Sequence, residues 1–383
     1  MSVFNGQPFL GQAVESILNQ SFTDLEFIVI DDGSTDDTWE TLAGYAVQDQ
    51  RLVLLRNQPN IGVVRSLNRG LEATRGEFIV RQDADDVSLP QRIGKQVAFL
   101  DAHPEVGVVA TVPQIVSVNG ASFGANAYTA TQNEEIQHRL LDHMCLCGPS
   151  IAVRRECLLA AGFYFSEGLD ASEDYDVCLR LAEVTQMASL AESLYQYRQH
   201  PNSASRTREQ KQMFNKAVAL ERAICRRFGP VPPQDKFATA ARDYLQAAII
   251  GVARNDLEAG RTSLSHALVL YPPLLETDEP LESLVRAYTP SEATEAALAY
   301  TESIFRDLLP HTRHLSRLES RVMSFLHMSE VFAGAEQNRP QRIKAHLWPG
   351  LRRDPTWLLN RGVISILAKS LLRRGDSKAG QLD

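Results

Sequence analysis

The feature that most constrains the fold is an alternation of short apolar runs with segments of helical periodicity in the first half of the chain. The apolar runs cover residues 25–30, 52–55, 77–80 and 106–110, and each has the length of a buried strand. In the segments between them, apolar residues recur at the spacing of one helix face. Strands that alternate with helices of roughly ten residues predict an α/β fold with a doubly wound, mostly parallel sheet.

An acidic loop follows the third of these strands. Asp83, Asp85 and Asp86 come after the run 77–80, and a Leu-Pro pair behind them indicates a helix start. Ligands bind at the carboxyl ends of strands in open α/β sheets. Neighbouring carboxylates repel one another unless a cation offsets their charge, and oxygen ligands suit Mg²⁺ or Mn²⁺. The loop predicts a site for a divalent ion and phosphates, although these residues alone fit a solvated turn better.

A second acidic junction lies upstream, where the strand 25–30 ends in Asp31 and Asp32. A Gly-Ser-Thr turn follows and can cap the next helix. Both carboxylates are then expected at the strand tip, facing the same crevice as Asp85. A carboxylate there can accept a hydrogen bond from a nucleobase imide or a ribose hydroxyl. A plain capped turn is the alternative, and it suits Asp36 better than Asp32.

Five motifs follow one another in the first 205 residues. They are Val3-Phe4-Asn5-Gly6, Asp31-Asp32-Gly33-Ser34-Thr35-Asp36, Asn60-x-Gly62 with Asn68-x-Gly70, Asp83-x-Asp85-Asp86, and Glu173-Asp174-Tyr175-Asp176. In this order and spacing they resemble the family 2 glycosyltransferases with the GT-A fold. The resemblance implies an enzyme that moves a sugar from a nucleotide-sugar donor to an acceptor hydroxyl, usually with inversion. It also implies glycan assembly at the cell envelope or polysaccharide synthesis, with a glycan or lipid-linked acceptor.

The resemblance also implies roles for single residues on the donor side. Asp85 would ligate Mn²⁺ or Mg²⁺, and His200 would complete this site or touch the diphosphate. Arg198 would contact the diphosphate, with a plain salt bridge as the alternative. The residues implied in nucleotide-sugar binding are Phe4, Asn5, Asp31, Asp32 and Asp83, of which Phe4 stands where the family places an aromatic residue against the base.

The general base implied by the resemblance is Asp174, and Glu173 or Asp176 would orient it or the acceptor. The residues that follow these acids have a helical pattern, so the acids are expected at a helix N-terminus. A helix dipole favours carboxylates there for structural reasons alone. Without the resemblance, the structural explanation of these acids is the stronger one.

The N-terminus departs from the family pattern. Family members usually have a full apolar strand before the Val-aromatic-Asn segment, whereas only Met1 and Ser2 precede Val3 here. Because this strand is central in the expected sheet, its loss would leave backbone groups without partners. We therefore expect the first strand to be truncated and the natural start to lie upstream.

Composition limits the class of protein. The chain has 383 residues, enough for two domains, and its net charge of −8 argues against nucleic acid as a partner. It holds no apolar run of roughly 18 residues and no signal-peptide pattern at Met1. We therefore expect the catalytic part in the cytoplasm, where nucleotide sugars are made. The five cysteines lack a second pair at zinc spacing, which indicates reduced thiols.

The strand pattern stops near Arg206. We therefore expect residues 1–205 to form the GT-A catalytic domain and residues 206–383 to form an all-helical domain. An internal repeat has a spacing of 83 residues (338 − 255 = 83): Asn255, Leu264, Leu268, Pro272 and Leu275 match Asn338, Leu347, Leu351, Pro355 and Leu358. The repeat resembles the helix pairs of tetratricopeptide-like arrays, which pack on their neighbours and can also bind a partner protein.

The charge of the helical half is uneven. Residues 339–374 hold nine basic side chains and one acid, together with Trp348 and Trp357. Such a segment can lie on an anionic bilayer, here the inner face of the plasma membrane. It can equally dock on the acidic catalytic domain.

Two other functions compete with sugar transfer. A nucleotidyltransferase also uses a doubly wound sheet and carboxylate-held Mg²⁺, but it needs a Gly-rich loop with Lys or Arg after the first strand. The Asn5-Gly6-Gln7-Pro8 segment is not such a loop. The other alternative is a helical adaptor with an inert glycosyltransferase half. The presence of all the expected acids argues against it.

Overall fold

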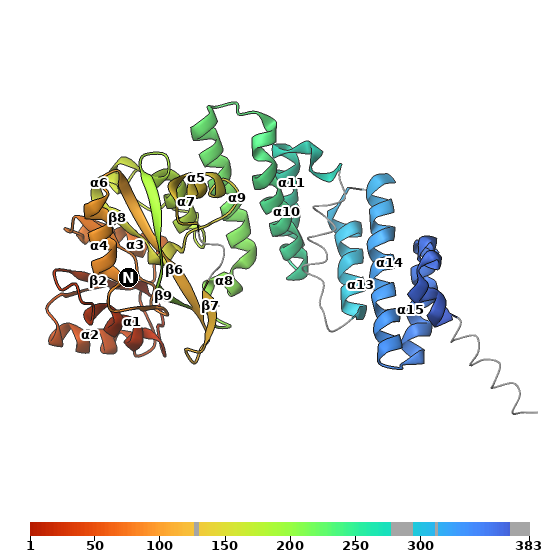
Figure 1. Ribbon diagram of the computed structural model, residues 1–383, viewed down its shortest axis with the longest axis horizontal. Coiled ribbons are helices and arrows are strands. Elements are labelled where there is room, and N and C mark those ends of the chain that lie inside the picture. The colour runs from red at the N-terminus through yellow and green to blue at the C-terminus, as the bar shows by residue number, and fades with distance from the viewer. Residues whose placement is uncertain (126–129, 277–293, 311–312, 368–383) are drawn as a thin grey trace, which may run out of the picture. The chain divides into compact units, whose positions relative to one another are not determined.

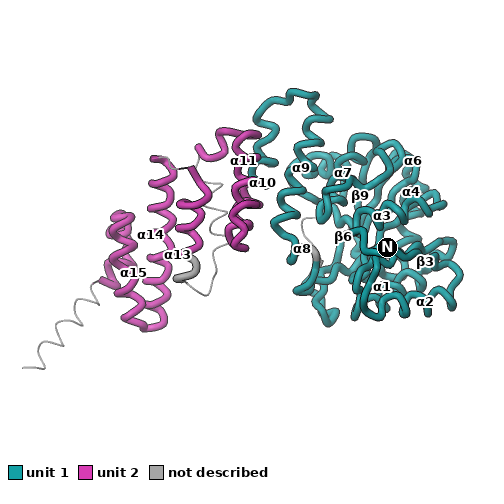
Figure 2. Tube along the Cα trace, turned by 180° about the vertical axis from the view of Figure 1, so that it is seen from behind, with its two compact units in different colours: residues 1–243 teal, residues 244–383 magenta. Residues whose placement is uncertain are grey.

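The computed structural model describes residues 1–125, 130–276, 294–310 and 313–367. The chain forms two compact units, Met1–Asp243 and Tyr244–Asp383 (Figure 2). The first unit extends past the expected boundary at residue 205. The reason is helix α9 (Glu209–Phe228), which packs on helix α7 (Glu173–Leu181) of the α/β part. The Ser172 hydroxyl donates a hydrogen bond of 2.8 Å to the Gln212 carbonyl and ties the two helices together.

The first unit begins with a three-stranded parallel sheet in the order β1-β2-β3 (Figure 1). Its strands are β1 (Ser2–Val3), β2 (Phe27–Asp31) and β3 (Leu52–Arg56), and the helices between and after them are α1 (Leu10–Leu18), α2 (Thr38–Gln48) and α3 (Val63–Ala73). Every residue of β2 is buried, as expected of a strand covered on both faces. The expectation of a longer first strand stays a prediction.

A second, mixed sheet follows in the order β4-β8-β6-β9-β5, with β7 paired to β6. Its strands are β4 (Phe78–Val80), β5 (Val87–Ser88), β6 (Val106–Val116), β7 (Ser122–Ala125), β8 (Ala152–Arg154) and β9 (Gln186–Arg198). The pair β6–β9 is parallel, and the other pairs are antiparallel. The helices of this part are α4 (Arg92–Ala102), α5 (Asn133–Arg139), α6 (Arg155–Ala160), α7 and α8 (Ala204–Thr207).

The second unit is helical in its described residues. Helix α10 (Ala238–Ala253) leads into it, and α11 (Leu257–Leu270), α13 (Thr294–Ser303), α14 (Arg313–Glu336) and α15 (Pro340–Arg353) follow. No described helix is long and apolar enough to span a membrane. The predicted fold class, an α/β fold followed by a helical domain, is confirmed.

The repeat noted in the sequence has a structural counterpart in this unit. Helices α11 and α15 each have 14 residues, and each is followed by a short 3₁₀ turn that starts with proline. The residues that connect each pair of helices, Asn255 and Asn338, both have left-handed backbone conformations with φ of 60° and 51°. Asparagine is one of the few residues other than glycine that enter this region readily. The likeness to tetratricopeptide-like arrays stays a prediction.

Candidate active site

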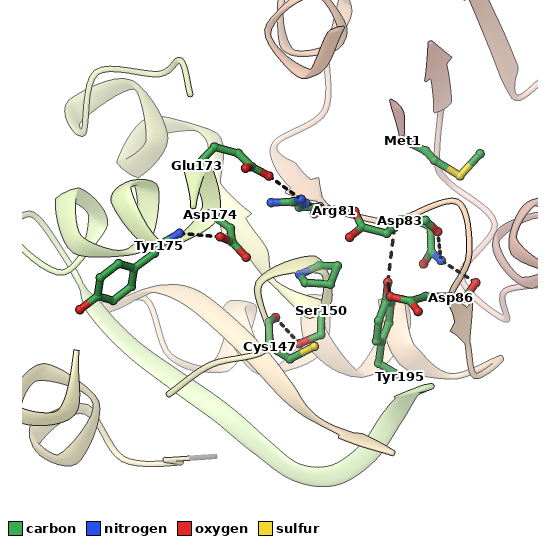
Figure 3. A network of polar contacts seen from close by, with 12 residues as sticks. Met1, Arg81, Asp83, Asp86, Cys147, Ser150, Glu173, Asp174, Tyr175 and Tyr195 are labelled. Carbon is green, nitrogen blue, oxygen red and sulfur yellow. Dashed lines mark hydrogen bonds and ion pairs between the residues drawn. The ribbon is translucent and has the colours of Figure 1, made fainter. Parts of the chain in front are cut away.

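The acidic loop after β4 is held at its base by β9. Asp86 is buried and accepts hydrogen bonds from the Tyr195 hydroxyl at 2.8 Å and the Arg198 backbone N–H at 2.7 Å (Figure 3 shows the Tyr195 side). The Asp83 backbone N–H donates to the same hydroxyl at 3.3 Å. Asp83 and Asp85 keep side-chain exposures of 33% and 37%. The loop therefore buries one carboxylate as an anchor and leaves two accessible to a ligand.

Asp85 and His200 lie in hydrogen-bond contact, and their predicted role as metal ligands stays a prediction. His200 Nε2 is 3.0 Å from Asp85 Oδ2. Two ligand atoms in adjacent octahedral positions, each at about 2.1 Å from a metal, lie about 3 Å apart, so this pair fits a divalent ion. Among the described residues no group of three or more His, Cys, Asp or Glu side chains could hold a metal. An ion here would therefore need ligands from water or a bound phosphate.

Burial also affects the ionisation of Asp85. Burial and the neighbouring Asp83 charge raise the pKa of Asp85, and the hydrogen bond with His200 opposes that rise. A bound cation would favour the charged carboxylate in the same way.

Arg198 anchors the acidic loop after β4. Its guanidinium donates to the Asp85 carbonyl at 2.8 Å, to the Val118 carbonyl at 3.1 Å and to Gln12 Oε1 at 2.8 Å. It also lies 4.7 Å from the centre of the Phe9 ring. The side chain is buried and most of its donors are used within the protein. The predicted diphosphate contact stays a prediction.

The aspartates at the end of β2 organise the loops around them. Asp32 is buried and accepts hydrogen bonds of 2.9 Å from the Asn57 side chain and from the backbone N–H groups of Ile61 and Gly62. Asp31 pairs with Arg56 at 3.0 Å. Asp32 therefore holds the loop that follows β3, whereas Asp31 pairs with the last residue of β3, and the predicted contacts of both with a nucleotide stay predictions.

Phe4 and Asn5 follow β1, and Asn5 contacts the turn after β2. Phe4 is exposed, and Asn5 has a left-handed backbone with φ of 52°. Asn5 Oδ1 accepts a hydrogen bond of 2.9 Å from the Thr35 backbone N–H. Asn5 thus joins the end of β1 to the turn after β2, and the predicted contact of Phe4 with a base stays a prediction.

A second acidic cluster begins helix α7. Glu173 is buried and pairs with Arg81 at 3.0 Å, while Asp174 is half-buried (Figure 3). Burial raises the pKa of both carboxyls, and the Arg81 charge opposes the rise. A general base works best when its pKa lies near the working pH, so a raised value suits Asp174.

Asp174 lies close to the backbone of the turn Gly148–Ser150. A Cβ atom on Gly148 would come within 2.1 Å of Asp174 Oδ2, so only glycine fits there with Asp174 in place. Asp176 has different partners, the Ser166 hydroxyl at 2.6 Å and Arg180 at 3.0 Å. The structure thus separates Asp176 from the pair formed by Glu173 and Arg81.

Sequence analysis did not identify Arg81 or Gly148 as part of the site. Arg81 stands two residues before Asp83. A single basic residue at the start of an acidic loop is the sequence feature from which its place in the site could have been predicted. Its side chain is 12% exposed and contacts Asp83 at 3.3 Å as well as Glu173. Through Arg81 the loop after β4 and the start of α7 form one cluster, although 92 residues separate Arg81 from Glu173.

Comparison with known proteins shows similarity to glycosyltransferases. Residues 1–160 match the family model described as glycosyl transferase family 2. EpsE, a putative glycosyltransferase of Bacillus subtilis, is 42% identical over 112 residues, which are 29% of this chain and 40% of that protein. An uncharacterized glycosyltransferase of Haemophilus influenzae is 27% identical over 209 residues, which are 53% of this chain and 65% of that protein.

A relative from Erwinia amylovora also matches. The amylovoran biosynthesis glycosyltransferase AmsE of Erwinia amylovora is 26% identical over 177 residues, which are 45% of this chain and 63% of that protein. The matched part of this chain spans less than two thirds of each of these three relatives. Residues 1–160 of this chain are therefore similar to the glycosyl transferase family 2 proteins.

Proposed function

We propose that this chain is a glycosyltransferase that moves a sugar from a nucleoside-diphosphate donor to a hydroxyl group of a glycan or lipid-linked acceptor. The observation that carries the proposal is the joining of two acidic clusters, Asp83 with Asp85 and Glu173 with Asp174, in a chain whose first 160 residues match the family model. The first cluster suits the donor diphosphate, and the second suits the acceptor. A single displacement with inversion needs both.

The donor side has two tasks. Asp85 and His200 would hold Mn²⁺ or Mg²⁺, and such an ion supplies the charge that a leaving diphosphate requires. Asp83 would contact the ribose or the water shell of the ion. The residues proposed to surround the nucleotide are Phe4, Asn5, Asp31 and Asp32, with Arg198 near the diphosphate.

The acceptor side supplies the base. Asp174 would accept the proton of the acceptor hydroxyl while its oxygen forms a bond to the anomeric carbon. The bond from that carbon to the diphosphate oxygen breaks in the same step, and the nucleoside diphosphate leaves with the electron pair. Glu173 would orient Asp174 or the acceptor. We give Asp176 only a structural role through Ser166 and Arg180.

The acceptor and location are further proposals. The name of the Erwinia relative favours polysaccharide assembly, and we place the enzyme in the cytoplasm, where nucleotide sugars are made. We also propose that the second unit contacts an anionic membrane surface. Trp348 and Leu359 are 66% and 83% exposed. Arg352 and Arg353 lie between them in the sequence, Arg361 follows them, and all three arginines are exposed.

Release of nucleoside diphosphate from a panel of nucleotide sugars, with and without Mn²⁺, tests the proposed activity. We expect release from one donor class that depends on Mn²⁺ and is lost in Asp85→Ala. Asp101→Ala removes an exposed acid on α4 and should leave release unchanged. Pyrophosphate release from nucleoside triphosphates would instead indicate a nucleotidyltransferase. No release from any donor would favour an inert adaptor.

A further inference from the structure

One guanidinium serves carboxylates from two distant parts of the chain. Arg81 follows β4, and its Nε lies 3.3 Å from Asp83 Oδ1 while its Nη2 lies 3.0 Å from Glu173 Oε1. Figure 3 shows Arg81 between Glu173 on one side and Asp83 on the other. Arg81 Nη1 is buried and has no hydrogen-bond partner among the described residues. The hydrogen bonds that the guanidinium makes therefore go to the acids of the proposed site.

The charges around Asp174 are unbalanced without Arg81. The main groups that interact with Asp174 electrostatically include Arg81, Asp83, Glu173 and the thiol of Cys178. Arg81 is the cation of this set. Coulomb repulsion among three carboxylates in a partly buried site favours the uptake of protons, whereas an adjacent cation favours the charged forms.

We propose that Arg81 is a positioning residue that couples the donor side of the site to the acceptor side. It fixes Asp83 and Glu173 by ion pairs and keeps Asp174 charged between turnovers. Two carboxylates in different directions require the planar fork of an arginine, whereas a lysine offers a single point charge. This inference rests on the proposed glycosyl transfer, because Asp174 is the base in that reaction.

The competing explanation is a structural one. Arg81 also lies 5.7 Å from the centre of the Phe165 ring, so it contributes to packing near α7. A packing role predicts lower stability in Arg81 variants, with the pH dependence of turnover unchanged. A positioning role predicts a shift in that pH dependence, and its sign follows from the charges.

Arg81→Gln removes the cation that opposes proton uptake by Asp174. The base is then protonated up to a higher pH, so the acidic limb of kcat should move upward by about 1 pH unit or more. Glu173→Gln removes a negative charge beside the same base, so its limb should move downward. Arg81→Lys keeps the charge and should restore most of the wild-type limb, with a lower kcat because one of the two ion pairs is lost.

The experiment measures kcat against pH for wild type and these three variants, with thermal melts to check folding. Arg51→Gln is the matched control, because Arg51 pairs with Asp49 just before β3, at the end of that strand away from the site. Opposite shifts in Arg81→Gln and Glu173→Gln support the inference. Unshifted limbs in folded variants overturn it, as does an equal shift in Arg81→Lys and Arg81→Gln.

Two further outcomes are informative. If Arg81→Gln does not fold, Glu173→Gln still tests the inference. A downward shift of its acidic kcat limb supports the inference, and an unchanged limb overturns it. Wild-type protein that releases no nucleoside diphosphate from any donor overturns the proposed function and this inference with it. Normal wild-type turnover with unshifted variants overturns this inference alone.

Discussion

At the scale of single residues, Gly148 determines how close the proposed base can lie to the turn beside it. A Cβ at this position would meet Asp174 Oδ2 at 2.1 Å, so Gly148→Ala must displace the carboxylate. We expect transfer to fall toward the loss expected of Asp174→Asn, which would remove a general base worth ~10²–10⁴ in rate. Nucleoside-diphosphate affinity, measured by calorimetry, should stay nearly unchanged.

Gly44→Ala is the matched control for this substitution. Gly44 lies in α2, and a Cβ there would meet nothing within 4 Å. Alanine in a helix interior is favoured over glycine by about 0.5–1 kcal/mol, so this variant should be at least as stable as wild type and fully active. Normal turnover in Gly148→Ala would show that Asp174 is not the base, or that it tolerates displacement.

The acids of the site were predictable from the sequence, whereas their partners were not. Asp83, Asp85, Glu173 and Asp174 stand at the ends of predicted elements, where a single sequence shows them. The ion pair between Arg81 and Glu173 depends on how the loop after β4 meets the start of α7, and no local pattern contains that. The short distance between Gly148 and Asp174 also depends on the tertiary structure, so no local sequence pattern predicts it.

At the scale of elements, the connections between α10 and α11 and between α14 and α15 each contain one residue with a left-handed backbone conformation. Asn338 has φ of 51° between α14 and α15. A β-branched residue in this region costs about 1–2 kcal/mol more than asparagine or glycine. We therefore expect Asn338→Val to lower the free energy of unfolding by roughly that amount and Asn338→Gly to change it little.

Urea unfolding of the full chain measures this effect, and Asn255 provides a repeat of the test. Asn255 has φ of 60° in the corresponding connection, so the Val and Gly variants there should behave alike. Gln341→Val introduces the same side chain on the exposed face of α15, where only a helix-propensity loss of about 0.7 kcal/mol or less is expected. Equal losses at positions 338 and 341 would contradict the role of the left-handed backbone.

The sheets show why some elements were not predicted. Apolar runs identified β2 and β6, which are mostly buried, and also β3 and β4, which are mostly half-buried. Strands β5 and β8 have two and three residues, too few for a period to be visible. The pairs that these short strands make are antiparallel, whereas β6 and β9 pair in parallel, so the second sheet is mixed.

At the scale of the whole molecule, the distribution of charge separates the two halves of the chain. Residues 339–374 hold nine basic side chains and one acid in a chain of net charge −8. In the described part of this segment, Lys344, Trp348 and Arg352 recur at the spacing of one helix face on α15, and all three are exposed. A basic face that carries an exposed tryptophan is typical of helices that lie on anionic membranes.

We expect the full chain to sediment with anionic vesicles at low salt and to remain in the supernatant with neutral vesicles or at high salt. Each basic residue near such a surface contributes about 1 kcal/mol, so several together give reversible binding. Arg352→Glu replaces a favourable charge with a repulsive one and should weaken binding by about tenfold or more. Trp348→Ala should weaken it without changing its salt dependence.

Lys236→Glu is the matched control, because it reverses one partly exposed charge outside the basic segment. It should bind anionic vesicles nearly as well as wild type if the segment 339–374 forms the contact. Equal recovery in the supernatant under all four conditions of lipid and salt would mean that the basic side chains serve packing within the protein. Equal weakening by Lys236→Glu and Arg352→Glu would instead show that only the total charge matters, since a defined membrane face predicts that the position of each charge decides its effect.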